Sequence, residues 1–307
     1  METVLILVQQ ILQMFILAGL GFLLFKGKKI SLESSKALGN ILIYLALPSV
    51  IIKGFLVERD AAHMLGILYS GLGAAVLLLL SILISRWLFG KDAIAAFASS
   101  FANPGFFGIP LIIASAAEKE GAVFYVACFV AFLNIGQWTY GVSILNGQPI
   151  RQGLSLKKLI RAPFIIAILI GLTLFFTQPA LPKMVTDCLS TVAALNTPLA
   201  MFTVGVYLAQ VDVLAMFRRK ALYAVAFSRL LLIPMISLLL LTLLPKDLLS
   251  MKTALLIASA CPVGVNVAVY AQLHGKDYAY AVETVVISTL LSVVTIPAVV
   301  WLSSVLW

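Results

Sequence analysis

Two short segments of this sequence combine asparagine with proline and glycine inside long apolar runs. They read F-A-N-P-G-F-F-G-I-P-L over residues 101–111 and A-C-P-V-G-V-N-V-A-V-Y-A over residues 260–271. Proline lacks an amide hydrogen and clashes with the preceding helical turn, so both runs are expected to be broken helices. Unwound backbone at membrane depth is tolerated only where it lines a cavity, and the free amides at a helix N-terminus favour anions. The two segments therefore predict a binding site for a small anion.

Side-chain amides are the polar groups nearest to these breaks. Asn103 and Asn266 can each donate and accept hydrogen bonds. In another apolar run Asn134, Gln137 and Tyr140 follow one another at intervals of three and share one helical face. They form either a polar cavity lining or a hydrogen-bonded seam between helices, and the sequence leaves both open. The predicted substrate-binding residues are Asn103, Pro104, Gly105, Asn134, Gln137, Pro262, Gly264 and Asn266.

Few charged residues fall inside the apolar runs. Arg229 lies deep in one run and is expected to pair with a carboxylate or with backbone carbonyl groups, because a charge at membrane depth is costly. Glu283 lies early in the last run, where its side chain is expected to reach the interface. Both are candidates for structural or ion-coupling charges. His63 and His274 are the two histidines, and no cluster with metal-ligand or catalytic spacing is found, so neither a metal site nor a catalytic site is expected.

The composition requires lipid around much of the molecule. Of 307 residues 62% are hydrophobic and only 11% are charged, which is far below the share in a soluble domain. The apolar runs are continuous and about 20 residues long, which selects helices over barrel strands. The formal charge of +9 lies mainly in short loops, so it indicates topology and not nucleic-acid binding. Ten spans are predicted, over residues 4–25, 36–55, 63–88, 93–115, 121–145, 163–178, 184–209, 219–244, 252–273 and 278–305.

The distribution of basic residues predicts the orientation of the chain. With the N-terminus outside, fourteen of the 21 lysines and arginines fall in inner loops and six in outer ones, with Arg229 inside a span. Both termini are therefore predicted to lie outside, in a multi-pass protein of the cell membrane. The basic segment 151–162 is expected to be an inner linker between a first five-span unit, 1–150, and a second, 163–307.

The two units resemble each other weakly. Pro48 has a counterpart in Pro198, and the break at Asn103-Pro104-Gly105 has one at Pro262-Val263-Gly264. Because each unit holds an odd number of spans, the second enters the bilayer from the opposite side. Inverted repeats with broken helices at matching positions are typical of secondary transporters, with the substrate site near the breaks.

The same segments resemble the auxin efflux carrier family, which includes plant PIN transporters and bacterial carriers for malate or malonate. Besides the two breaks, N-T-P-L-A-M-F-T-V-G-V-Y-L (196–208), I-Y-L-A-L-P-S (43–49) and V-V-I-S-T-L-L-S-V-V-T-I-P (285–297) carry the likeness, which spans the whole chain. The resemblance implies an all-α fold of ten transmembrane helices in two inverted five-helix repeats, as in bile-acid symporters. It also implies crossed broken helices 4 and 9, and a transport domain that moves like an elevator.

The resemblance further implies residue roles. Asn103 and Asn134 fall where PIN-like carriers contact the substrate carboxylate or its surroundings, and Pro262 falls at the crossing proline. The chain departs from the pattern at Ala102, which stands where PIN carriers have the other crossing proline, and it lacks their long central loop.

The sequence thus predicts a secondary transporter of a small carboxylate. A passive channel is the first alternative and an intramembrane enzyme the second; enzymatic activity is not expected because acid–base groups are sparse within the spans. No cofactor is expected, and whether H⁺ or Na⁺ drives transport is left undecided. The expected partners are the carboxylate and the lipid bilayer, with no nucleic acid, and a homodimer is left open.

Overall fold

The computed structural model describes residues 2–115, 121–147 and 161–307, and most of these residues are helical. Within them no strand forms, apart from one isolated antiparallel bridge between Ala102 and Val263. The predicted linker 151–162 lies outside the described residues except for its last two. The helices, with π-helical and 3₁₀ segments labelled η, are α1 (Glu2–Lys26), α2 (Leu32–Ile41), η1 (Leu42–Ala46), α3 (Leu47–Gly54), α4 (Ala61–Phe89), α5 (Ala93–Ser100), η2 (Pro104–Gly108), α6 (Ile109–Ala114), α7 (Ala122–Gly136), η4 (Gln137–Gly141), α8 (Val142–Asn146), α11 (Pro163–Thr177), α12 (Lys183–Ala193), α13 (Asn196–Gln210), α14 (Val213–Met216), α15 (Lys220–Phe227), η5 (Ser228–Leu232), α16 (Ile233–Thr242), η6 (Lys246–Leu248), α17 (Leu249–Ala260), α18 (Asn266–Leu273) and α19 (Tyr278–Leu306).

Seven helical stretches of the described chain are long and apolar enough to cross a membrane, so the chain is a multi-pass membrane protein. They are Val4–Lys26, Leu32–Gly54, His63–Phe89, Ala122–Asn146, Lys183–Gln210, Lys220–Thr242 and Tyr278–Leu306. Each coincides with a predicted span. Two of the other three predicted spans, 93–115 and 252–273, are helical in shorter pieces, since α5 and η2–α6, and likewise α17 and α18, are separated by non-helical residues. The third, 163–178, is the single 15-residue helix α11.

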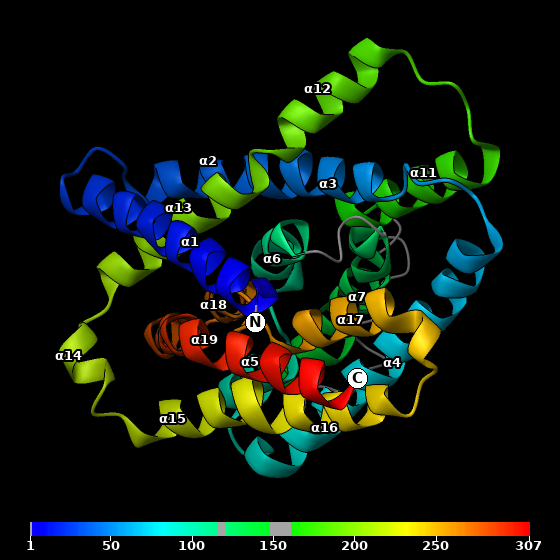
Figure 1. Cartoon of the computed structure of the whole chain (residues 1–307). Helices are drawn as coiled ribbons and strands as arrows, with labels where there is room; N and C mark the ends of the chain where they lie inside the picture. Colours follow the sequence, from blue (N-terminus) through cyan, green and yellow to red (C-terminus); the bar gives the residue numbers. More distant parts are fainter. Residues whose placement is uncertain (1, 116–120, 148–160) are drawn as a thin grey trace.

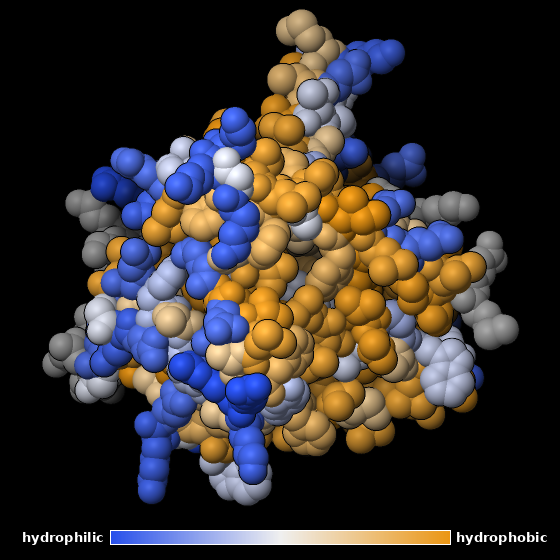
Figure 2. Space-filling model, turned by 90° about the vertical axis from the view of Figure 1, so that its left-hand side faces the viewer, coloured by the Kyte–Doolittle hydropathy of each residue, from blue (hydrophilic) through white to orange (hydrophobic). Residues whose placement is uncertain are grey.

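The surface of α4 shows how these helices meet their surroundings. Its exposed apolar side chains recur at intervals of three or four, which places them on one helical face: Leu65, Leu68, Leu72, Val76, Leu79 and Leu83. Figure 2 shows a broad hydrophobic area of this kind on another face of the molecule, with hydrophilic side chains gathered along one side of it. Such an area is suited to lipid and not to water.

The helices pack in two groups. The first group consists of α1, η1 with α2 and α3, α11, α12 and α13, in which α1 packs along α13 and α3 packs on α11 and α12. The second group consists of α4 to α8 and α15 to α19, in which α4 packs on α5 and α7, and α17 packs on α7, α16 and α19. In Figure 1, α2, α3, α11 and α12 lie in the upper part of the view, and α5, α15, α16 and α19 in the lower part.

Acidic residues begin several of the helices. The carboxylate oxygens of Asp60, Asp92 and Asp277 accept hydrogen bonds from the backbone amides of His63, Ala95 and Tyr280, at 2.7, 3.0 and 3.0 Å. Each bond satisfies an amide that has no partner within its own helix, and each negative charge stabilises the positive helix end. These acidic residues therefore fix where α4, α5 and α19 start.

Candidate functional site

The first interruption lies between α5 and η2. Helix α5 ends at Ser100, residues 101–103 are non-helical, and the chain turns helical again at Pro104. The sequence placed this break at Asn103-Pro104-Gly105, and of these three residues only Asn103 lies in the non-helical segment. Instead Pro104 opens η2 and Pro110 lies in the first turn of α6. The helix is broken as predicted, but the break lies about two residues earlier than expected. The reason is that proline, lacking an amide hydrogen, is well suited to the first turn of a helix, where that amide needs no partner.

The second interruption lies between α17 and α18. Helix α17 ends at Ala260 and α18 begins at Asn266, so Pro262 and Gly264 both lie inside the break, as predicted. The backbone amide of Val263 donates to the Ser288 hydroxyl of α19 at 3.0 Å. This bond satisfies one of the buried polar groups that the unwound backbone leaves.

The two interruptions lie against each other. Ala102 and Val263 form the antiparallel bridge, and the amide of Gly264 donates to the Phe101 carbonyl at 2.9 Å. A Cβ on Gly264 would lie 2.8 Å from the Ala102 carbonyl oxygen, so only glycine allows the two backbones to approach this closely. Ala102, unlike the proline of PIN carriers, keeps its amide hydrogen at the crossing.

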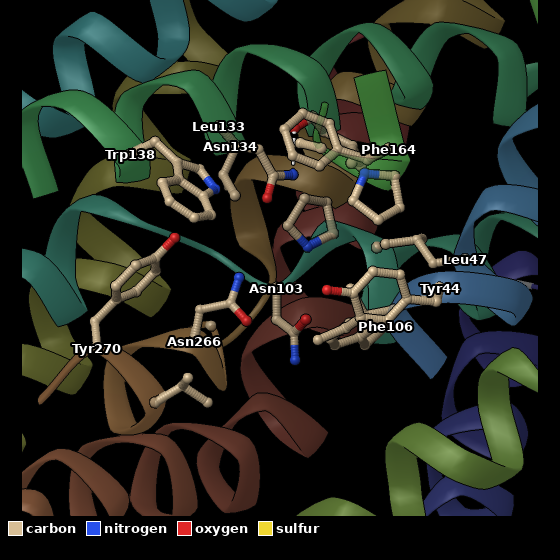
Figure 3. A pocket seen from close by; sticks show the side chains of 18 of the residues that line it. Tyr44, Leu47, Asn103, Phe106, Leu133, Asn134, Trp138, Phe164, Asn266 and Tyr270 are labelled. Carbon is tan, nitrogen blue, oxygen red and sulfur yellow. Dashed lines mark hydrogen bonds between the residues drawn. The ribbon is translucent and has the colours of Figure 1, made fainter. Parts of the chain in front are cut away.

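A cavity of about 480 Å³ lies beside this crossing (Figure 3), which is within the range of small-molecule sites. Of the eight predicted site residues, Asn103, Pro104, Gly105, Asn134, Gly264 and Asn266 line it. Figure 3 shows the Asn103, Asn134 and Asn266 side chains gathered around one space, although they come from the first break, α7 and α18. The structure thus brings together three amides from distant parts of the sequence.

The three amides are held to different degrees. The Asn134 side chain donates to the Val130 carbonyl at 2.7 Å, and that of Asn266 donates to the Gln137 side-chain oxygen at 2.9 Å. Each NH₂ group has a second hydrogen available. The Asn103 side chain is 6% exposed and makes no hydrogen bond to the described chain. All three can therefore donate to a guest molecule.

Gln137 and Pro262, also predicted to bind substrate, are not part of the cavity wall. Gln137 is fully buried behind Asn266, whose amide it holds, and Pro262 is buried within the second break. The face chosen from the sequence, at intervals of three, was therefore only partly right. The residues of this span that line the cavity are Val130, Leu133, Asn134 and Trp138, at intervals of three and four.

Aromatic side chains complete the wall of the cavity, and they were not among the site residues predicted from the sequence. Trp138 and Tyr270 lie on one side of the space and contact each other edge to face, with ring centroids 6.0 Å apart (Figure 3). Tyr44, Phe106 and Phe164 lie on the other side. Tyr270 follows Asn266 by four residues, so an i, i+4 search from the asparagines would have found both Trp138 and Tyr270.

The electrostatics of the cavity favour a negative guest. Arg161, an exposed residue, is the one charged side chain among the described residues that line it, and none of these is Asp or Glu. Helix η2 begins at Pro104 and α18 at Asn266, so two helix N-termini start at the wall. The positive dipole ends of these helices add to the side-chain amide donors.

The two intramembrane charges lie away from this wall. The Glu283 carboxylate forms an ion pair with Arg219, the residue that precedes α15, with 2.6 Å between the guanidinium nitrogen and the carboxylate oxygen. The Glu283 side chain is therefore anchored and does not extend freely to the interface. Arg229 is 1% exposed and pairs with backbone carbonyl groups, which selects one of the two partners expected for it.

A second cavity, of about 340 Å³, lies close to the first. Its lining includes Lys53, Val57, Gly121 and Asn196. The Asn196 side chain, at the start of α13, donates to the Gly105 carbonyl at 3.0 Å, and Gly105 belongs to the wall of the first cavity. One hydrogen bond between the two helix groups therefore joins the walls of both cavities.

The described chain thus has an all-helical, multi-pass membrane fold with a cavity of small-molecule size beside the crossing of its two broken helices. The sequence matches the family described as "Membrane transport protein" over residues 6–153 and 151–301. The chain therefore belongs to this family, the auxin efflux carriers, which confirms the resemblance found in its motifs. It is also 28% identical, over 289 residues that cover 88% of this chain and 87% of the other, to a Rhizobium meliloti (strain 1021) protein described as "Putative malonate transporter".

Proposed function

We propose that this chain is a secondary transporter of a small carboxylate, and that malonate or a dicarboxylate of similar size is its substrate. The observation that carries the proposal is the cavity at the two broken helices. It is lined by four side-chain amides, those of Asn40, Asn103, Asn134 and Asn266, and by Arg161, and within the described chain by no acidic side chain. The likeness to a protein described as a malonate transporter supports the choice of a short dicarboxylate.

In this proposal one carboxylate accepts hydrogen bonds from the amides of Asn103, Asn134 and Asn266. The helix N-termini at Pro104 and Asn266 stabilise its charge. The second carboxylate lies nearer the edge of the cavity, where Arg161 can pair with it in a bidentate manner. The aromatic wall excludes water around the carbon chain of the substrate.

Alternating access is proposed to follow from the two helix groups. The cavity lies between them, since Tyr44, Leu47 and Phe164 come from the first group, whereas Asn103, Asn134 and Asn266 come from the second. Movement of the second group against the first would carry the site across the membrane as an elevator. This proposal includes ten spans in two inverted repeats, with both termini outside the cell membrane. In that orientation Arg161 and the 480 Å³ cavity face inward and Lys53 and the 340 Å³ cavity face outward.

The proposal is tested with purified protein in liposomes loaded with unlabelled malonate, by uptake of radiolabelled malonate. Saturable uptake that is accelerated by malonate on the other side of the membrane indicates a carrier, and uptake that rises linearly with concentration would indicate a channel.

Asn103→Ala should weaken the apparent affinity by about tenfold, because it removes hydrogen bonds to a charged group. Asn146→Ala, at an exposed position that ends α8 outside both cavities, is the matched control and should behave as the wild type. Equal affinity of the Asn103 variant and the wild type would reject the assignment.

A further inference from the structure

Arg229 is the most deeply buried charged side chain that the cavity does not use. It lies in η5, in the middle of the helical stretch Lys220–Thr242. Its guanidinium donates to the carbonyl oxygens of Ser99, at 3.0 Å, Ser100, at 3.3 Å, and Ser259. In the described chain no Asp or Glu forms an ion pair with it. The charge of Arg229 is thus compensated by backbone carbonyl groups and not by an acid.

These carbonyl groups belong to two helix C-termini. Ser100 is the last residue of α5, and Ser259 is the last but one of α17. The final carbonyls of a helix have no partner within it, and each C-terminus carries about half a negative charge. Two such ends facing one point sum to roughly one negative charge. A single buried guanidinium matches that charge and joins both broken helices.

The surroundings of Arg229 are rich in hydroxyl groups. The Ser81 hydroxyl accepts from the guanidinium at 3.0 Å and donates to the Ser100 carbonyl at 2.8 Å. Ser228 and Ser85 lie within 2.8 and 2.9 Å of the Ser99 hydroxyl oxygen. Oxygen atoms from α4, α5, η5 and α17 therefore converge at one place, all within the second helix group.

Converging carbonyls and half-helix C-termini are the kind of ligand set with which broken-helix transporters hold Na⁺. We propose that Arg229 is a built-in monovalent cation that occupies such a position here, so that the crossing forms and works without bound Na⁺. Arg229 is a positioning residue: Asn103 follows Ser100 by three residues, and Asn266 follows Ser259 by seven. By holding both C-termini it sets where the cavity amides lie. One consequence of this inference rests on the proposed function: carboxylate transport is not coupled to Na⁺ at the crossing.

Thermal unfolding of the purified protein tests this assignment without any substrate. The unfolding midpoint is measured in NaCl and in N-methyl-D-glucamine chloride at equal ionic strength. The wild type should show the same midpoint in both salts. Arg229→Ser removes the cation and leaves a hydroxyl oxygen, so its midpoint in N-methyl-D-glucamine chloride should fall on the order of 10 °C. Added NaCl should then restore much of that loss in a saturable manner.

Two further variants separate a cation site from a general loss of packing. Arg229→Lys keeps a charge at the crossing and should unfold at a midpoint that does not depend on Na⁺. Arg219→Ser removes the same charge from the partly buried ion pair with Glu283 and should show no Na⁺ dependence either.

Two results would overturn the assignment: a wild-type midpoint that rises with Na⁺ in place of the organic cation, or an Arg229→Ser protein that is equally unstable in both salts. Malonate uptake is then compared with and without Na⁺. Wild-type uptake that requires Na⁺ would contradict the inference, and absence of malonate uptake would contradict only the proposed function.

Discussion

At the residue scale, the site depends on neutral side-chain amides. The Asn103, Asn134 and Asn266 side chains can donate hydrogen bonds and carry no charge, and a charged arginine stands only at the edge of the cavity. A neutral donor set can hold a carboxylate and also release it, whereas several buried cations would bind it too tightly for turnover. The amides could be found from the sequence because polar residues are rare in these runs.

Asn266→Asp tests this choice of neutral donors. The partner of Asn266 is Gln137, whose amide nitrogen is buried without a partner and could turn to donate to an aspartate. The variant should therefore fold, but its negative charge should weaken malonate binding by more than about a hundredfold. Isothermal titration calorimetry at neutral pH measures the loss, and unchanged affinity would mean that the substrate does not approach Asn266.

The aromatic residues of the wall were harder to predict from the sequence. Tyr44 lies in η1 and Phe164 lies in α11, and both line the cavity. These two elements are far from both breaks in the sequence. Nothing in their local pattern distinguishes them from the lipid-facing aromatics of an apolar helix. Only the packing of the two groups brings them to the amides.

At the element scale, the crossing of the two breaks positions the site. The presence of both interruptions could be predicted, because proline and glycine cluster there. The position of the first could not be placed to the residue, because the same proline that disrupts a helix interior can begin a helix. The partners of Arg229 were likewise left open, since a sequence does not show which helix ends converge.

Gly264→Ala tests the crossing itself. The new Cβ would lie 2.8 Å from the Ala102 carbonyl oxygen, so the backbones must separate and the 2.9 Å bond from Gly264 to Phe101 should weaken. We expect a loss of about 1–3 kcal/mol in the free energy of unfolding, together with a loss of malonate binding. Gly39→Ala in α2 is the control, because nothing lies within 4 Å of the added carbon there and alanine favours a helix. Wild-type binding by the Gly264 variant would show that the crossing does not shape the site.

At the scale of the whole molecule, the two helix groups meet at few polar contacts. One of them is the bond from Asn196 to the Gly105 carbonyl, which joins the walls of the two cavities. The division into groups was implied by the family resemblance and not by any pattern in the residues. In the proposed elevator movement this bond must break in every cycle.

Asn196→Ala should therefore alter the conformational balance more than substrate binding. Loss of one buried hydrogen bond, about 1 kcal/mol, should shift the balance away from the described arrangement by roughly fivefold. The shift is measured by labelling a Leu273→Cys variant, at the lining of the larger cavity, with a membrane-impermeant thiol reagent after Cys188 has been replaced by serine. Labelling should slow relative to the parent protein. Thr197→Ala, at the adjacent residue of the smaller cavity, should leave the rate unchanged. Equal labelling rates in all three proteins would show that the bond does not hold this arrangement.

The position of the bound substrate can be measured directly with a brominated dicarboxylate. Bromomalonate is first shown to be taken up by proteoliposomes, and crystals grown with it then give the bromine position from its anomalous scattering. We predict one peak in the 480 Å³ cavity, among Asn103, Asn134 and Asn266. A peak confined to the 340 Å³ cavity or to the lipid-facing surface, for a compound that the protein transports, would contradict a carboxylate site at the crossing of the two broken helices.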